Sequence, residues 1–233
     1  MADESLRRLE RLAEAGDLEA RARLLRERMR LGELPAERLG LLALLEDPLA
    51  AQALGQELPE TRPSPKDWAR MLAPLGPEVV VRVAVGLARA VLRRDEPYSL
   101  RAIRAAEAWV LNQDKARAEA AGQAADAIAA RRWAIEAHLH SSVEAAEAAA
   151  RVAQFATLPV GPPFTANMDA PYWLGICARS AIRAAPGGED ETRAALRQEV
   201  LPWVMGQGDP IALRRRHTSG IDDASVEGAP VRF

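Results

Sequence analysis

The segment that most constrains the fold of this chain is residues 77–94, PEVVVRVAVGLARAVLRR. Its polar positions include Glu78, Arg82, Arg89 and Arg93. On a helix these four positions fall on one narrow stripe, and nearly all the remaining surface is valine, leucine, alanine or glycine. A helix that is apolar over most of its surface lies in the middle of a bundle. Because β-branched residues also favour strands, a buried strand is the alternative, although the sequence shows no partner strand elsewhere.

An alanine-rich block lies further along the chain. Ten of the twenty residues from Ala116 to Ile135 are alanine. Alanine has the highest helix propensity because its side chain loses almost no entropy on helix formation. Faces of alanine also let two helix axes approach closely. We therefore expect two long helices, at residues 114–138 and 142–156, which pack against the helix of residues 77–94.

The first 56 residues have the pattern of two helical hairpins. Gly16 suits the left-handed position that ends a helix, and Asp17 can cap the next one. Residues 46–48, Glu-Asp-Pro, repeat this stop-and-cap device between the third and fourth helices. The shared plan of helix, acidic turn and helix is similar to tetratricopeptide-like repeats. The polar residues 56–66 include three prolines and form the best linker candidate in the chain.

These patterns predict an all-α fold in which repeat-like helical hairpins precede an alanine-rich multi-helix bundle. We expect the hairpins at residues 1–56, the bundle at 64–214 and a flexible C-terminal tail at 215–233. The last bundle helix should reach about Met205, with Pro202 bending it. The tail after it lacks a sustained apolar pattern.

Charge and composition exclude several classes of protein. The chain has 31 basic and 33 acidic residues and a formal net charge of -2, so we expect no nucleic-acid partner. Its most apolar run, residues 79–92, is too short and too interrupted by arginine to enter a membrane. The charged N-terminus lacks a signal-peptide core, and a single cysteine, Cys177, allows no disulfide within one chain. These features predict a cytoplasmic location.

Few residues offer catalytic or metal-binding chemistry. The three histidines are His138, His140 and His217. On a helix His138 and His140 lie about 200° apart, and Glu136 with His140 would supply only two of the ligands that an ion needs. We interpret this stretch as a solvated helix end whose imidazoles favour the negative end of the dipole. Cys177 is flanked by apolar residues and should be a buried thiol. We expect no catalytic residue, no cofactor and no metal site.

Three features could bind a partner. The proline-rich segment of residues 157–173 carries aromatic side chains of the kind that anchor interfaces. An arginine run follows later, and the chain ends in a phenylalanine with a free carboxylate. The candidate partner-binding residues are Phe164, Tyr172, Trp173, Arg214, Arg215, Arg216 and Phe233. The alternatives are that the aromatic residues close one end of the core and that the arginines form a solvated helix end.

The stretch PYSLRAIRAAEAWV, residues 97–110, followed by alanine-rich helices, resembles the all-helical immunity proteins of bacterial polymorphic toxin systems. The residues that carry the resemblance are Pro97, Arg101, Ala102, Ile103, Ala105, Ala106, Ala108 and Trp109. The resemblance covers about residues 79–156. It implies a non-enzymatic protein that binds and neutralises a toxin, and it supplies no catalytic residues.

The leading hypothesis is therefore a protein that binds another protein, either a toxin or a subunit of a complex. A homo-oligomer is left open by the sequence. The alternative is a helical-repeat scaffold or adaptor that binds a peptide or protein through its hairpins or its aromatic segment. An enzyme would need a polar pocket that gathers distant groups such as Glu136, His140 and Arg82.

Overall fold

The computed structural model describes residues 2–58, 61–93, 96–131, 139–156 and 169–218. Within these ranges the chain is all-helical and contains no strand, as the sequence predicts. Two hairpins come first, formed by α1 (Ala2–Glu14), α2 (Leu18–Arg30), α3 (Ala36–Leu44) and α4 (Pro48–Leu54). The bundle that follows comprises α5 (Pro65–Leu72), the 3-10 turn η1 (Ala73–Leu75), α6 (Pro77–Ala90), α7 (Pro97–Leu111), α8 (Lys115–Ala129), α9 (His140–Phe155), α10 (Ala170–Ala184), α11 (Gly188–Val204) and α12 (Pro210–Thr218).

Helix α6 lies in the middle of the bundle, and the alternative of a buried strand is wrong. Every residue from Val79 to Ala88 is buried, and α6 packs against α7, α9, α10 and α11. Pro77 occupies the first helical position, where its missing N–H costs nothing. The buried stretch includes one arginine, Arg82, whose charge requires partners inside the fold.

Alanine faces pack the bundle helices closely. Helix α9 packs against α6, α7, α8 and α10, and its buried alanines are Ala145, Ala146, Ala148, Ala149, Ala150 and Ala153. Two expectations for this region are wrong. Helix α8 ends at Ala129, before a turn at residues 130–131, and it packs against α7 and α9 rather than α6. Because α7, α9, α10 and α11 already cover α6, α8 lies in a second layer.

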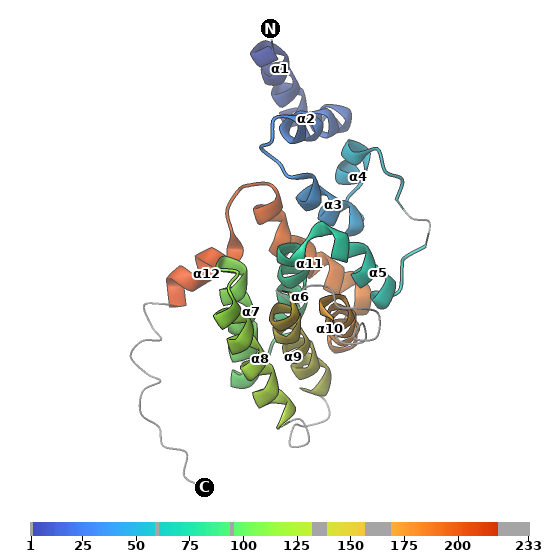
Figure 1. The fold of residues 1–233 in the computed structure, drawn as a ribbon. Helices are drawn as coiled ribbons and strands as arrows, with labels where there is room; N and C mark the ends of the chain where they lie inside the picture. The colour runs from blue at the N-terminus through green and yellow to red at the C-terminus, as the bar shows by residue number, and fades with distance from the viewer. Residues whose placement is uncertain (1, 59–60, 94–95, 132–138, 157–168, 219–233) are drawn as a thin grey trace.

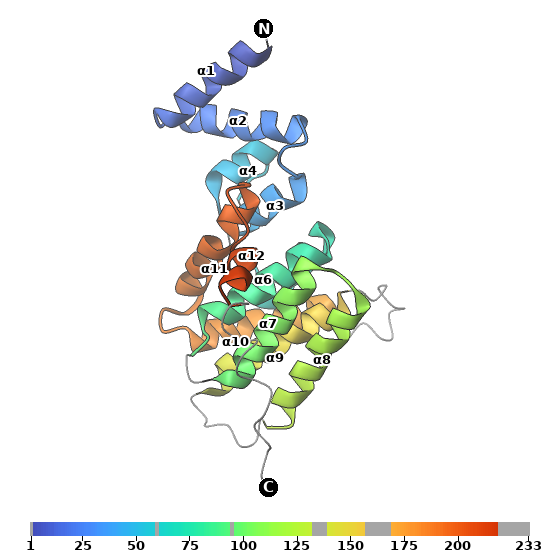
Figure 2. The same cartoon turned by 90° about the vertical axis from the view of Figure 1, so that its left-hand side faces the viewer.

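The predicted stop-and-cap devices are confirmed in both hairpins. The side chain of Asp17 accepts a hydrogen bond from the backbone N–H of Ala20 at 3.0 Å. Asp47 accepts one from Ala50 at the same distance. Helix α1 packs against α2, and α2 packs against α4, so the hairpins are stacked. The α1–α2 hairpin projects away from the bundle in both views (Figures 1 and 2).

The second hairpin is fastened to the bundle through the end of α3. The carbonyl oxygen of Leu44 accepts hydrogen bonds from the indole N–H of Trp68 at 3.1 Å and from Arg193 at 3.5 Å. Arg197 donates to the neighbouring carbonyl of Leu45. Cations at a helix C-terminus satisfy free carbonyls and stabilise the helix dipole. The hairpin α3–α4 is thus a fixed base from which α1–α2 extends.

The C-terminal region contains a helix that the sequence did not predict. Helix α11 contains Pro202 and ends at Val204, close to the expected end. Gly206 and Gly208 then adopt φ values of +69° and +140°, and α12 follows. The predicted tail of residues 215–233 begins within α12, and residues 219–233 lie outside the described ranges. None of the described helices is both long enough and apolar enough to cross a lipid bilayer.

Candidate functional site

Cys177 is a buried thiol packed between helices, as the sequence predicts. Its Sγ donates to the carbonyl oxygens of Ala84 and Ala145, each at 3.4 Å. Burial raises the pKa of the Cys177 thiol far above its ordinary value, and the nearby charge of Glu144 raises it further. Since the thiolate is the nucleophile and the metal ligand, this cysteine is chemically inert in the folded chain.

The histidine stretch differs from its predicted geometry. His140 is exposed and begins α9, so it lies at the positive end of a helix dipole rather than the negative end of a preceding helix. His138 and Glu136 lie outside the described residues, and His217 lies in α12. In the part of the chain that the structure describes, no three side chains of His, Cys, Asp or Glu gather in a way that could hold a metal ion.

Arg82 is the centre of one buried ion-pair cluster. Its side chain is 6% exposed and donates to both oxygens of Asp209, at 3.0 and 2.7 Å, and to Glu78 at 2.9 Å. Its guanidinium also lies 4.2 Å from the ring centroid of Trp203. Burial alone would raise the pKa of Asp209, but Arg82 and the backbone N–H groups of residues 211 and 212 outweigh burial and lower that pKa. The cluster joins α6 to the segment before α12.

Glu107 is the centre of a second cluster on α7. This residue is 1% exposed, and its carboxylate accepts hydrogen bonds from Arg89 at 2.6 and 2.9 Å. Arg214 donates to the same carboxylate at 3.1 and 3.0 Å and also pairs with Glu199. The cluster therefore connects α6, α7, α11 and α12. Arg214, one of the predicted partner-binding residues, is engaged inside the protein.

Among the described residues, the other predicted partner-binding residues lie on two helices, Tyr172 and Trp173 on α10 and Arg215 and Arg216 on α12. Tyr172 is 45% exposed on α10, and its ring makes an edge-to-face contact with Trp173, with centroids 5.5 Å apart. Trp173 is partly buried against the core, and its indole N–H has no acceptor among the described residues. Arg215 and Arg216 are exposed on α12, which packs against α7 and α11. Phe164 and Phe233 lie outside the described residues.

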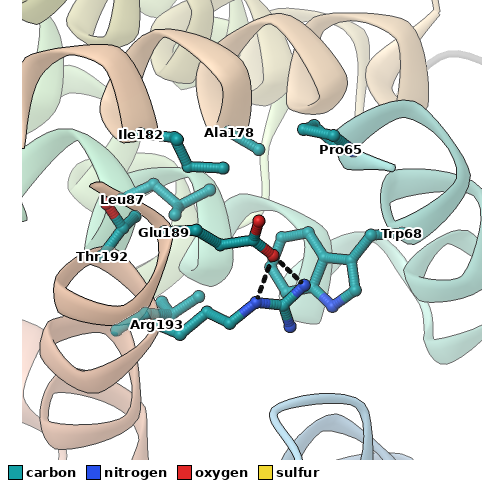
Figure 3. A pocket seen from close by; sticks show the side chains of 9 residues that line it. Pro65, Trp68, Leu87, Ala178, Ile182, Glu189, Thr192 and Arg193 are labelled. Carbon is teal, nitrogen blue, oxygen red and sulfur yellow. Dashed lines mark hydrogen bonds and ion pairs between the residues drawn. The ribbon is translucent and has the colours of Figure 1, made fainter. Parts of the chain in front are cut away.

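Two hollows lie on either side of α5. Figure 3 shows the first, where the ion pair between Glu189 and Arg193 crosses beside Trp68. Its volume of about 20 Å³ holds roughly one water molecule, so it is not a substrate pocket. The second hollow has a volume of about 560 Å³ and lies between α5 and α10. Its lining includes Lys66, Arg70, Ala73, Tyr172, Gly175 and Arg179.

Comparisons with known proteins give this chain no relative: no protein-family model, no curated protein and no solved structure matches it. The sequence left open whether Tyr172 anchors an interface or closes one end of the core, and its side chain is 45% exposed on α10. The sequence did not single out the basic residues that line the same hollow, Lys66 and Arg179. The available signal was weak, because two exposed cations 113 residues apart (179 − 66) resemble any solvated helix face.

Proposed function

We propose that this chain acts by binding another protein, without catalytic chemistry of its own, and that its partner is a bacterial toxin that it neutralises. The observation that carries the proposal is the projecting α1–α2 hairpin (Figures 1 and 2). The identity of the partner as a toxin rests on the resemblance of residues 97–110 to immunity proteins.

The hairpin exposes apolar side chains on a fixed base. Leu18, at the start of α2, is 59% exposed, and Leu31, just after its end, is 50% exposed. Leu12, near the end of α1, is exposed as well. Leucines at a projecting surface gain free energy when a partner removes them from water, whereas they contribute little to the fold of the free chain. The hairpin thus offers an anchor for a protein interface.

Three buried groups that could do chemistry, Cys177, Arg82 and Glu107, are engaged inside the fold. The thiol of Cys177 is buried and stays protonated because burial raises its pKa. Arg82 and Glu107, the most buried charged groups on α6 and α7, are held in ion pairs. These side chains stabilise the bundle and are not poised to act on a substrate, which supports a binding role.

The motif that carries the family resemblance belongs to the core. Ala102, Ile103, Ala106 and Trp109 are all buried, so they specify the packing of α7. A partner would therefore meet other residues, such as those of the hairpin.

The test is co-expression of this chain with the products of the genes that neighbour its own in the native host. The proposal predicts that one product inhibits growth of the expressing cells, that the chain restores growth, and that the two proteins purify together. Neither rescue nor a complex with any of these products would contradict a toxin-neutralising role.

Variants of the exposed leucines locate the interface. We expect Leu18→Lys and Leu31→Lys to weaken the complex by about tenfold or more, because anchor residues carry most of the binding free energy. Leu111→Lys is the matched control, since Leu111 is also exposed but lies at the end of α7. Equal affinity in all three variants would show that the hairpin is not the interface.

A second candidate, a helical-repeat scaffold that binds a peptide or protein, is favoured by the stacking of the hairpins through α2 and α4. The same experiment separates the two functions. A scaffold would form a complex that depends on Leu18 and Leu31, but its partner would not inhibit growth.

A further inference from the structure

The hollow between α5 and α10 is built from one face of each helix. Lys66, Arg70 and Ala73 recur at spacings of four and three residues on and just after α5. Tyr172, Gly175 and Arg179 recur at three and four on α10. Such spacings bring side chains to the same side of a helix. The two helices meet at the glycine, where a Cβ atom would lie 3.5 Å from the Cα of Lys66.

The lining of this hollow is positively charged. It holds three cations, Lys66, Arg70 and Arg179, and one carboxylate, Asp169, which gives a net charge of +2 (3 − 1). Asp169 is engaged as the cap of α10, where its Oδ1 accepts the N–H of Tyr172 at 2.9 Å. The chain as a whole has a net charge of -2, so the lining of this hollow has the opposite sign to the whole chain.

Two of these cations have no ion-pair partner among the residues that the structure describes. Arg70 lies 3.4 Å from Asp67 of its own helix, an exposed pair of the kind that contributes little. Lys66 and Arg179 are exposed and form no ion pair with any residue that the structure describes. By sequence, residues 157–168, which precede α10, contain no acidic side chain that could neutralise them. The arrangement thus attracts an external anion.

The hollow also offers an apolar surface beside its charges. The ring of Tyr172 is half-exposed at the hollow and is held by its edge-to-face contact with Trp173. Ala73 and Gly175 add small apolar surfaces. A volume of about 560 Å³ is in the range of sites that bind small molecules.

We propose that this hollow binds a small organic dianion, whose phosphate or paired carboxylates contact Lys66 and Arg179 and whose apolar body packs on Tyr172. Arginine and lysine both form charge-assisted hydrogen bonds to such oxyanions. This site does not depend on the protein partner proposed above. It gives the chain a small-molecule ligand in addition to that partner.

The proposal is tested by titrating the ¹⁵N-labelled full chain with phenyl phosphate, isophthalate and inorganic phosphate in a low-salt buffer. We expect saturable chemical-shift changes at the amides of Ala73, Tyr172 and Gly175, with phenyl phosphate binding more tightly than inorganic phosphate. Preference for phenyl phosphate over isophthalate would identify a phosphoryl ligand, and the reverse a dicarboxylate; either result supports the site.

Exposed-residue variants then test the named contacts. Lys66→Gln and Arg179→Gln should each weaken binding of the preferred dianion about tenfold, because each removes a charge-assisted hydrogen bond. Arg183→Gln is the matched control, since Arg183 is an exposed arginine one turn further along α10 and outside the lining. Tyr172→Ala should reduce the affinity for phenyl phosphate to that for inorganic phosphate.

Three outcomes would overturn the proposal. The first is the absence of saturable shifts at the hollow with any of the three probes. The second is equal loss of affinity in Arg179→Gln and Arg183→Gln, which would indicate non-specific attraction to positive charge. The third is binding of a tetraglutamate peptide at the hollow when none of the dianions binds, which would indicate a surface for an acidic protein segment.

Discussion

The guanidinium of Arg82 forms two hydrogen bonds with the carboxylate of Asp209, at 3.0 and 2.7 Å, although 127 residues separate them in the chain. Arg82 lies on the central helix α6, whereas Asp209 lies immediately before α12. This pair therefore fixes the point at which the chain turns back onto the bundle. The same aspartate caps the start of α12, because its Oδ1 accepts a hydrogen bond from the backbone N–H of Ile211 at 3.0 Å.

Removing the charge of Asp209 should destabilise the fold. In Asp209→Asn the buried Arg82 keeps only Glu78 as a charged partner among the described residues, so we expect a loss of about 2 kcal/mol in the free energy of unfolding. Urea denaturation followed by circular dichroism measures this loss. Asp190→Asn is the control, because Asp190 pairs with Arg62 at the exposed surface. The free energy of unfolding of this variant should be close to that of the wild type.

The stabilising effect of Asp209 should depend on pH. Its pKa is lower in the folded chain than in the unfolded chain, so its contribution is fully present above the unfolded pKa of about 4 and is lost as the pH falls through the folded pKa. The difference in unfolding free energy between wild type and Asp209→Asn should therefore shrink as the pH is lowered from neutral to below about 4. If the difference in unfolding free energy stays constant over this pH range, the ionisation of Asp209 is not coupled to folding.

The Glu107 cluster should hold α12 against the bundle. In Arg214→Ala, α12 loses its bonds to Glu107 and Glu199, and we expect faster amide hydrogen exchange over residues 210–218 with little change in the core helices. Leu213→Ala, at an exposed position on the same helix, should leave the exchange of α12 nearly unchanged. Glu107→Gln should instead lower global stability, by about 3 kcal/mol, because Arg89 loses its partner as well.

Local patterns predicted most of the helices because they depend on neighbouring residues. The apolar surface of residues 77–94 identified the central helix, and Asp17 and Asp47 identified two helix starts. The early end of α8 had no such signal, since neither glycine nor proline occurs at residues 129–131. Helix α12 was missed because Ile211 is the one buried apolar residue among its described side chains, and ion pairs such as that of Arg214 with Glu107 also attach it.

The candidate sites were harder to predict because they combine residues that are distant in sequence. A buried Arg82 implies a counterion, but its position on the helix does not reveal that Asp209 supplies it. The contacts of the arginine run 214–216 likewise involve residues that are distant in sequence. Arg214 pairs with Glu107, whereas Arg215 and Arg216 are exposed, and Arg215 donates to the carbonyl oxygen of Arg104 at 3.0 Å. Which of the three arginines is partly buried and which are exposed depends on how α12 packs on α7 and α11, and the sequence does not show that packing.

The buried thiol provides a probe of global unfolding. Because burial raises the pKa of Cys177, a thiol reagent should label the native chain very slowly at mildly alkaline pH and label it rapidly in concentrated guanidinium. The native labelling rate should rise in Asp209→Asn in proportion to the increase in the unfolded population. Rapid labelling of the native wild type would show that α6, α9 and α10 separate locally around the cysteine.

Two glycines on helices should respond in opposite ways to alanine. At Gly86 a Cβ atom would lie 2.6 Å from the Cδ1 of buried Leu196, so Gly86→Ala should cost about 1–3 kcal/mol by forcing α6 and α11 apart. At Gly122 the nearest atoms, at 2.7 Å, belong to the end of the flexible Gln154 side chain, which can move away. Gly122→Ala should therefore be neutral or gain up to about 1 kcal/mol from helix propensity. Urea denaturation measures the free energy of unfolding of both variants. Equal changes in the two variants would contradict a tight contact between α6 and α11.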